Sequence, residues 1–193
     1  VFVLILHQTL LIAMGLLTGG QNEVRLNLDA KKKYNYYWLT YPVWQLMLVR
    51  SCFMLLIYSF LALYYFGYSF ESYGVNRLAS INDLFLLIVP FLLSVIFLGM
   101  IIGLLIPHKE LATLIVLLSS LPLVFTAGFI WPTSSIPTII NIVAQFFPST
   151  PAISAFLRLN QMGDSFQQVT HLWQQLWLLT FIYAVIAGIL LYK

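Results

Sequence analysis

The chain has 193 residues and a net charge of +3, and 61% of its residues are hydrophobic while only 8% are charged. A water-soluble domain of this size carries about 25% charged residues, so the composition excludes an ordinary soluble domain. No basic block occurs beyond Lys31-Lys32-Lys33, which gives little support for nucleic-acid binding. We therefore expect an all-α polytopic membrane protein, since helices pair all their backbone groups within lipid.

Five predominantly apolar runs are long enough to cross a hydrocarbon core of roughly 30 Å, which takes about 20 helical residues. Pro42 suits the start of the second run, because the first helical turn does not need the N–H that proline lacks. Val1 stands inside the first run, so we expect the natural protein to have further N-terminal residues. The predicted transmembrane helices cover residues 1–19, 43–66, 84–106, 111–129 and 172–192.

Between the fourth and last runs, residues 131–163 are moderately apolar but interrupted by prolines. The run without proline at residues 138–147 is too short to cross a membrane. Short apolar helices of this kind are typical of re-entrant elements, so we predict an outward re-entrant helical hairpin. A loop resting on the membrane surface is the alternative. The interrupting prolines are Pro132, Pro137, Pro148 and Pro151.

Lysine and arginine placement predicts the orientation, because cytoplasmic segments carry an excess of both. If the five helices alternate, seven of the nine Lys and Arg residues fall on one side. The connector (residues 20–41), the short turn at 107–110 and the C-terminus are then cytoplasmic. The loop at 68–83 and the hairpin face outward. The seven residues are Arg25, Lys31, Lys32, Lys33, Arg50, Lys109 and Lys193.

The connector combines its lysines with aromatic residues at 34, 36, 37 and 38, which suits an interfacial amphipathic segment. It is either an anchor that sets the topology or a docking surface for a cytoplasmic partner. Small residues spaced by four, as at Gly15 and Gly19 or Gly99 and Gly103, favour close helix packing. That packing is either within the chain or between protomers.

Catalytic and metal-binding patterns are absent from the sequence. There is no phosphate-binding loop, dinucleotide fingerprint, HExxH motif or paired-cysteine site. Arg50, close to the interface, is the only charged residue within the five runs, which argues against an ion-coupled transporter. His7 is the one titratable candidate there, and we interpret it as a polar packing residue. We expect no catalytic residue, no metal site and no enzymatic activity.

A longer pattern occurs around the predicted hairpin. Gly128-Phe129-Ile130-Trp131-Pro132 is followed by Ile136-Pro137, then Phe147-Pro148-Ser149-Thr150, Arg158 and Gly163. With the order of the apolar runs, this resembles the C-terminal transmembrane part of type-2 ATP-binding-cassette (ABC) exporter permeases. The resemblance covers essentially the whole chain. In that family a first span and a large extracytoplasmic domain come before the part that corresponds to Val1.

The resemblance implies a permease subunit of an ATP-driven exporter that moves its substrate outward by alternating access at a dimer interface. It implies cytoplasmic ABC ATPase partners, which bind ATP and Mg, and no cofactor on this chain. The second protomer is the same or a different permease. Membrane lipids and a periplasmic adaptor are further partners, and the bacterial inner membrane is the expected location. The alternative is a non-transporting membrane subunit or an ion-coupled secondary transporter.

The resemblance also implies two sets of site residues. The connector would form an interfacial coupling helix against the ATPase, and the hairpin would close the outward end of the path. Arg158 would either snorkel to the outer interface or contact cargo. The coupling residues are Arg25, Asp29, Lys31, Lys32, Lys33 and Tyr36. The outward-gate residues are Phe125, Gly128, Phe129, Pro132, Pro137, Pro148 and Arg158.

Overall fold

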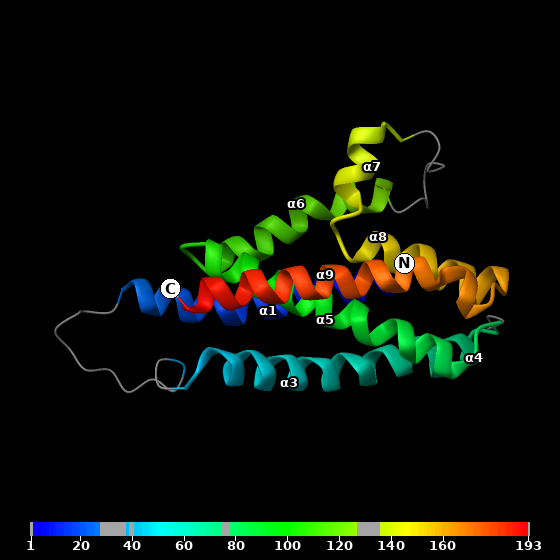
Figure 1. The fold of residues 1–193 in the computed structure, drawn as a ribbon, viewed down its shortest axis with the longest axis horizontal. Helices are drawn as coiled ribbons and strands as arrows, with labels where there is room; N and C mark the ends of the chain where they lie inside the picture. Colours follow the sequence, from blue (N-terminus) through cyan, green and yellow to red (C-terminus); the bar gives the residue numbers. More distant parts are fainter. Residues whose placement is uncertain (1, 28–37, 39–40, 75–77, 127–135, 193) are drawn as a thin grey trace.

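The computed structural model describes residues 2–27, 38, 41–74, 78–126 and 136–192, and every regular element in them is helical (Figure 1). Four helices are long and apolar enough to cross a membrane, and a bent helix pair makes a fifth candidate if it counts as one span. This confirms the predicted all-α polytopic membrane fold. The four are α1 (Phe2–Leu26), α3 (Val43–Leu63) with its π-helical continuation η1 (Tyr64–Ser69), α5 (Ile81–Leu105) and α9 (Phe166–Tyr192).

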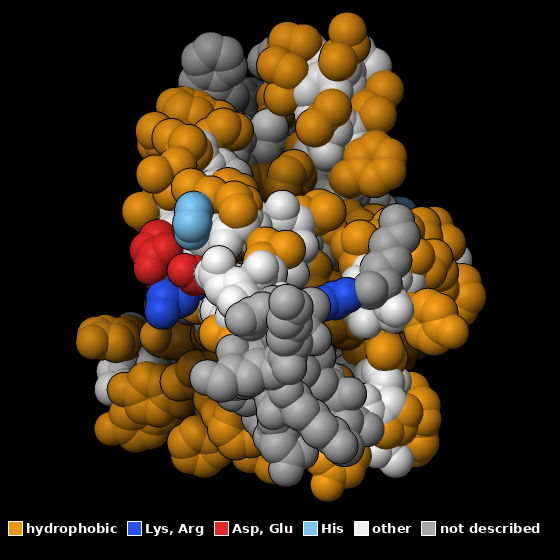
Figure 2. Space-filling view, turned by 90° about the vertical axis from the view of Figure 1, so that its left-hand side faces the viewer, with side chains coloured by type: hydrophobic (Ala, Val, Ile, Leu, Met, Phe, Trp, Pro, Cys, Tyr) orange, Lys and Arg blue, Asp and Glu red, His pale blue; other side chains and the backbone are white. Residues whose placement is uncertain are grey.

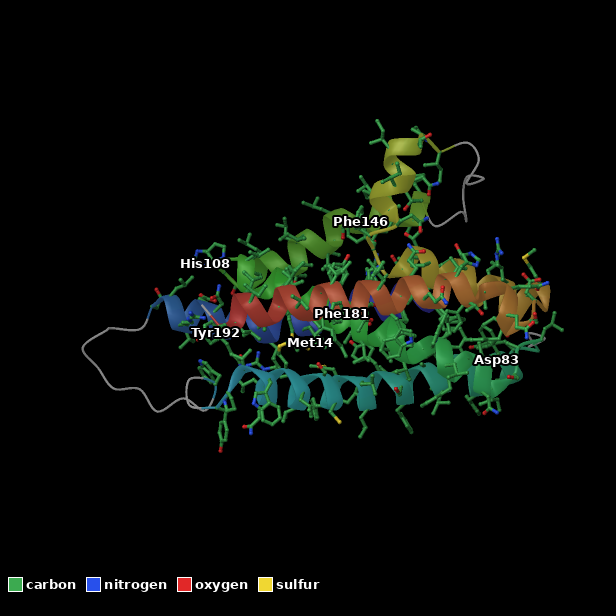
Figure 3. All side chains as sticks on the ribbon, viewed as in Figure 1. Met14, Asp83, His108, Phe146, Phe181 and Tyr192 are labelled. Carbon is green, nitrogen blue, oxygen red and sulfur yellow. The ribbon has the colours of Figure 1, made fainter. Side chains whose placement is uncertain are left out.

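α5 lies at the centre of the bundle, where α1, α9 and α3 all pack against it (Figure 1). We call one end of the molecule the connector end: α1, α5 and α9 end there, and α3 begins there. His108 and Tyr192 lie at this end, and Asp83 lies at the opposite end (Figure 3). The connector, the short turn and the C-terminus therefore share one end, as the alternating arrangement of helices requires.

Glycines bring α1 and α5 into close contact. A Cβ atom added at Gly99 would lie 2.7 Å from the Met14 Cβ, and one added at Gly103 would lie 2.6 Å from the Thr18 Oγ1. Gly15 similarly faces α6, where its added Cβ would be 2.9 Å from the Cβ of Ala112. Side chains have no room at these points, so the spaced small residues serve packing within the chain.

α9 compensates for a proline inside α5. Pro90 has no N–H, so the carbonyl of Leu86, four residues earlier, loses its helical donor. The Trp173 Nε1 of α9 donates to this carbonyl at 3.1 Å, and the Thr180 hydroxyl donates to the Pro90 carbonyl at 3.0 Å. Backbone groups freed in a membrane helix need such partners, which ties α9 to the central helix.

Several helix bounds differ from the predicted ones. α1 was expected to end at Gly19 but continues to Leu26, and α9 starts at Phe166, before the expected residue 172. The end of an apolar run marks where the chain leaves the hydrocarbon. The helix itself can continue beyond that point, because its polar turns are exposed to water or pack against other helices. α6 (Glu110–Thr126) has 17 described residues and is not among the four helices long enough to cross a membrane.

Two short helices follow α6 within the predicted hairpin. α7 (Thr138–Ala144) is preceded by Pro137, and α8 (Ser149–Leu157) by Pro148. α8 continues into the π-helical turn η3 (Arg158–Met162), and the two helices are bent by 92° relative to each other, as in a broken span or a re-entrant loop. α7 stands away from the main bundle (Figure 1). Prolines therefore start both short helices.

Candidate functional site

At the connector end, the last turns of α1 are joined to the turn between α5 and α6. The side-chain amide of Asn22 donates to the carbonyl oxygens of Leu104 and Ile106, at 3.1 Å each. These carbonyls lie at the end of α5, where helices leave acceptors without a partner of their own. Asn22 thus caps α5 from a neighbouring helix.

Glu23 extends this attachment to the turn itself. Its Oε2 accepts from the backbone N–H of Lys109 at 3.5 Å, and its Oε1 lies 3.7 Å from the Nδ1 of His108. Gly19 and Gly20 also lie against the Lys109 side chain, since Cβ atoms added there would meet it within 4 Å. α1 is therefore held on the α5–α6 turn by residues from Gly19 to Glu23, which cover little more than one helical turn.

A cavity of about 230 Å³ opens beside this attachment. Arg25 from the last turn of α1 and Arg50 from α3 line it. Arg50 is only 8% exposed, and its guanidinium Nη2 donates to the Oε1 of Gln21. Viewed from this end, a few charged side chains are visible among hydrophobic ones (Figure 2). The remaining lining residues are Thr18, Asn22, Trp38, Tyr41, Val43, Leu46, Leu104, Leu191 and Tyr192.

The predicted coupling residues fall partly in this region. Arg25 lies in the last turn of α1 and lines the cavity. The other five, Asp29, Lys31, Lys32, Lys33 and Tyr36, lie outside the described residues, and so does the expected interfacial helix. Sequence reasoning gave Asn22 and Glu23 no role, because both fall in the polar connector that was placed after the apolar run at residues 1–19. A signal existed in the spacing: Asn22 and Glu23 follow Thr18 and Gly19 by four residues, so a helical continuation of α1 places each on the same face as the residue before it.

On the hairpin side, hydrogen bonds connect α7 to α9. The Gln175 Nε2 donates to the backbone carbonyl of Gln145 at 3.2 Å and to its side-chain Oε1 at 2.9 Å. The Tyr183 hydroxyl donates to the carbonyl of Phe146. Gln175 is nine residues along α9, or about 14 Å from its first residue at 1.5 Å per residue. The end of α7 is therefore fixed well inside the length of the bundle.

Of the predicted gate residues, four are described. Phe125 lies in the last turn of α6 and is 45% exposed, and Pro137 and Pro148 precede the two short helices. Arg158 is exposed at the end of α8, where its carbonyl accepts from the N–H of Asp164 at 3.1 Å. Phe125 and Arg158 thus belong to different helices of the hairpin region. Gly128, Phe129 and Pro132 lie outside the described residues.

Metal-ligating side chains do not converge in the described part of the chain, where no three His, Cys, Asp or Glu residues could hold one ion. His7 is fully buried in α1, and its ring nitrogens make no hydrogen bond among the described residues. Cys52 is a free, exposed thiol on α3. Among the described residues, side-chain hydrogen bonds between different helices occur at the connector end, between α7 and α9, between α9 and α5, and between Gln8 of α1 and Ser120 of α6.

Comparison with known proteins identifies the family. A family model described as ABC-2 family transporter protein matches residues 5–192, which is nearly the whole chain. Neither curated proteins nor solved structures give a match. The family model and the bundle of apolar helices agree, so the chain belongs to the ABC-2 transporter family and is a multi-pass membrane permease subunit of an ABC transporter, whose ATPase is a separate partner.

Proposed function

We propose that this permease subunit moves a substrate outward by alternating access, driven by an ABC ATPase that docks at the connector end. The observation that carries the proposal is the attachment of the α1 extension to the α5–α6 turn through Asn22 and Glu23. A partner that pushes on this end would move α1 and α5 together. The remainder of the connector, including Tyr36, would complete the coupling surface.

Close packing between α1 and α5 supports transmission of that movement along the membrane normal. Met14 and Thr18 lie directly against Gly99 and Gly103, with no space for an added methyl group. Tightly packed interfaces of this kind shift as units and do not deform gradually. Force applied at the last turns of α1 would therefore reach the middle of the bundle.

The second protomer of the proposed dimer would pack against α6 and α7. Both helices expose large apolar side chains, including Leu118 at 70% and Ile139 at 77%. α7 also stands away from the main bundle (Figure 1). Two such surfaces facing each other would enclose a translocation path between protomers that are identical or different permeases.

The hairpin would close the outward end of this path. Gln175 and Tyr183 hold the end of α7 against α9, while Phe125 lies in the last described turn of α6. We expect Phe129 to add a second aromatic ring to the closure. Opening would require α6 and α7 to move relative to α9.

The orientation of the permease and the membrane it occupies are inferred from the charge distribution and from the family. The seven Lys and Arg residues assigned to the connector side favour a cytoplasmic connector end. A bacterial inner membrane and a periplasmic adaptor fit this orientation. ATP and Mg would bind to the ATPase and not to this chain.

Nucleotide-dependent accessibility tests the proposal. In a Cys52→Ser background, single cysteines are placed at Lys32, Ser72 and Phe125, and intact cells that contain the ATPase are treated with a membrane-impermeant maleimide. We expect Ser72→Cys to be labelled, Lys32→Cys to be protected, and labelling of Phe125→Cys to change when ATP–vanadate traps the complex in right-side-out vesicles. An inactive ATPase is the control.

Labelling of Lys32→Cys in intact cells would reverse the orientation. Labelling of Phe125→Cys that does not respond to nucleotide would favour a non-transporting subunit. A response to an ion gradient in the absence of the ATPase would favour an ion-coupled transporter.

A further inference from the structure

We propose that an aromatic pocket toward the end of the bundle opposite the connector end binds a neutral single-ring ligand that carries a hydroxyl group, such as a phenol. The pocket has a volume of about 120 Å³. It lies among the start of α1, the turn η1 with the short helix α4 (Phe70–Ser72), and α8 with the turn η3. Occupancy of this pocket requires no transport step and is therefore independent of export.

Two π-helical turns meet at the pocket. η1 contributes Phe66, and η3 contributes Asn160 and Gln161. The backbone carbonyl of Asn160 accepts from the N–H of Leu78 at 3.3 Å, and Gly163 ends η3 with a left-handed φ of 71°. π-helical turns are rare, and they occur frequently at functional sites. This part of the chain therefore differs from the regular spans, and its backbone is fixed from a second segment.

The side chain of Asn160 is the polar group that a ligand would satisfy. It is only 3% exposed, and its Oδ1 accepts no hydrogen bond among the described residues. A buried acceptor without a partner costs free energy that a bound donor recovers. An ordered water molecule is held by about three polar partners, whereas Asn160 and Gln161 are the only polar side chains among the described lining residues. A mostly apolar ligand with one donor group suits this arrangement better than water does.

Phenylalanine rings form the walls of the pocket. The rings of Phe66 and Phe156 stack with centroids 4.8 Å apart and planes inclined by 6°, and Phe70 meets Phe66 edge-on at 5.6 Å. Phe2 lies 5.7 Å from Phe70, so the rings hold one another in place. Aromatic rings gain from stacked or edge-to-face contacts beyond the area that they bury. The walls therefore favour an aromatic ligand over an aliphatic ring of the same size.

Size and charge restrict the ligand further. A dry apolar cavity of about 150 Å³ accepts one benzene molecule, so a pocket of about 120 Å³ that is open on one side holds a single ring. Leu157, which is 47% exposed, and the exposed Gln161 mark the side where it opens. No ionisable side chain occurs among the described lining residues, so a charged ligand would be buried without a partner. A neutral ring with one hydroxyl group fits the volume, the walls and the acceptor of Asn160.

Binding is measured by fluorine NMR on the full-length permease in complex with its ATPase, purified in detergent. The probes are 4-fluorophenol, fluorobenzene and 4-fluorocyclohexanol, and samples of detergent alone correct for partition into micelles. We expect 4-fluorophenol to saturate one site and to bind at least about threefold more tightly than 4-fluorocyclohexanol. In Asn160→Ala its affinity should fall at least about fivefold, because the hydroxyl is then buried without a partner, while the affinity for fluorobenzene stays within about twofold.

Two further variants complete the design. The bulky side chain in Leu157→Trp, at the exposed mouth of the pocket, should exclude all three probes. Asn141→Ala, at a half-buried asparagine of α7 that does not line the pocket, is the matched control and should leave the three affinities unchanged.

The proposal is overturned if 4-fluorophenol shows no saturable binding beyond that of micelles, or if 4-fluorocyclohexanol binds equally well. It is also overturned if Asn160→Ala weakens both aromatic probes equally or neither of them, since the amide then makes no contact with the hydroxyl. An equal loss in Asn141→Ala would contradict it as well, because a general effect on the fold would then suffice. If Asn160→Ala fails to assemble with the ATPase, Leu157→Trp decides the question: unchanged binding of 4-fluorophenol there would show that the probe binds elsewhere.

Discussion

α5 and α6 follow each other in the chain and are both apolar, yet they occupy different environments. In α5, 13 of 25 residues are buried, whereas in α6 only 4 of 17 are, so α5 contributes far more of its length to the core. α5 carries Gly99 and Gly103 where α1 approaches, whereas α6 has no glycine in its described turns. Apolarity thus brings a helix into the membrane, and small residues decide which helices pack closely.

The same contrast separates two parts of the molecule. α1, α5 and α9 are joined by close packing and by hydrogen bonds to backbone groups at Leu86, Pro90 and Leu104. α6 and α7 expose most of their apolar side chains; α7 connects to α9 near Gln145, and α6 packs against α1. We interpret the first part as a stable frame and the second as the part that adapts to a partner or to substrate.

The largest effect is expected at the α1–α5 contact. Gly103→Ala would place a methyl group 2.6 Å from Thr18 Oγ1 and 2.7 Å from the backbone oxygen of Gly15, which cannot move aside. Such overpacking costs about 1–3 kcal/mol. Thermal unfolding of the purified protein in detergent should show a clearly lower midpoint. Gly67→Ala is the control, because no atom lies within 4 Å of its added Cβ. Equal unfolding midpoints for the two variants would contradict the claim that close α1–α5 packing stabilises the bundle.

A smaller loss is expected at the connector end. Asn22→Leu removes the donor to two carbonyls at the end of α5, which costs about 1–2 kcal/mol where water replaces it incompletely. ATP hydrolysis by the complex should continue, whereas the nucleotide-dependent labelling of Phe125→Cys should be lost. Asn27→Leu is the control, since Asn27 is exposed and donates only to Glu23 of its own helix. If labelling in Asn22→Leu still changes with nucleotide as in the unmodified permease, the attachment through Asn22 does not transmit the movement.

A double-mutant cycle tests the compensation of Pro90. Trp173→Phe leaves the Leu86 carbonyl without its donor and should cost about 0.6–1.7 kcal/mol, the range found for such bonds in membranes. Pro90→Ala restores a backbone N–H for that carbonyl, so the same substitution should cost less in this background. Equal costs in both backgrounds, measured by thermal unfolding, would show that Trp173 contributes only packing.

The smallest effect on stability is expected at the α7–α9 connection. Gln175→Leu removes two hydrogen bonds to Gln145 and should lower stability by only about 0.6 kcal/mol. It should nevertheless raise basal labelling of Phe125→Cys, because α7 is less firmly held. Gln174→Leu, at the neighbouring exposed position, provides the control. Equal labelling in the two variants would show that the Gln175–Gln145 hydrogen bonds do not contribute to closing the path.

The fold class could be predicted from the sequence because a long uncharged run has few alternatives in lipid. The ends of the helices could not. α1 continues beyond Gly19 because Asn22 and Glu23 find partners at Leu104, Ile106 and Lys109, and those partners lie more than 80 residues away in the chain. Contacts over such a distance leave no periodic signal in a single sequence.

The candidate site was predictable to a similar extent. Arg25 was assigned to the connector end by charge placement alone, and the structure gives it a place in the cavity there. Pro90 signals a freed carbonyl at Leu86, but nothing in the sequence indicates that Trp173 is its donor. The short length of the proline-free run predicted a helix near Thr138–Ala144, while its connection to Gln175 depends on tertiary packing.

Distances between spin labels test the central claim most directly. One pair, Leu26→Cys and Leu105→Cys, reports on the frame at the connector end, and the other, Leu118→Cys and Leu178→Cys, reports on α6 relative to α9. All four positions are exposed. Each pair is introduced into Cys52→Ser permease, diluted with unlabelled protomers and assembled with the ATPase. On trapping with ATP–vanadate, we expect the first distance to stay constant and the second to change by several ångströms. A first distance that changes as much as the second would contradict the account.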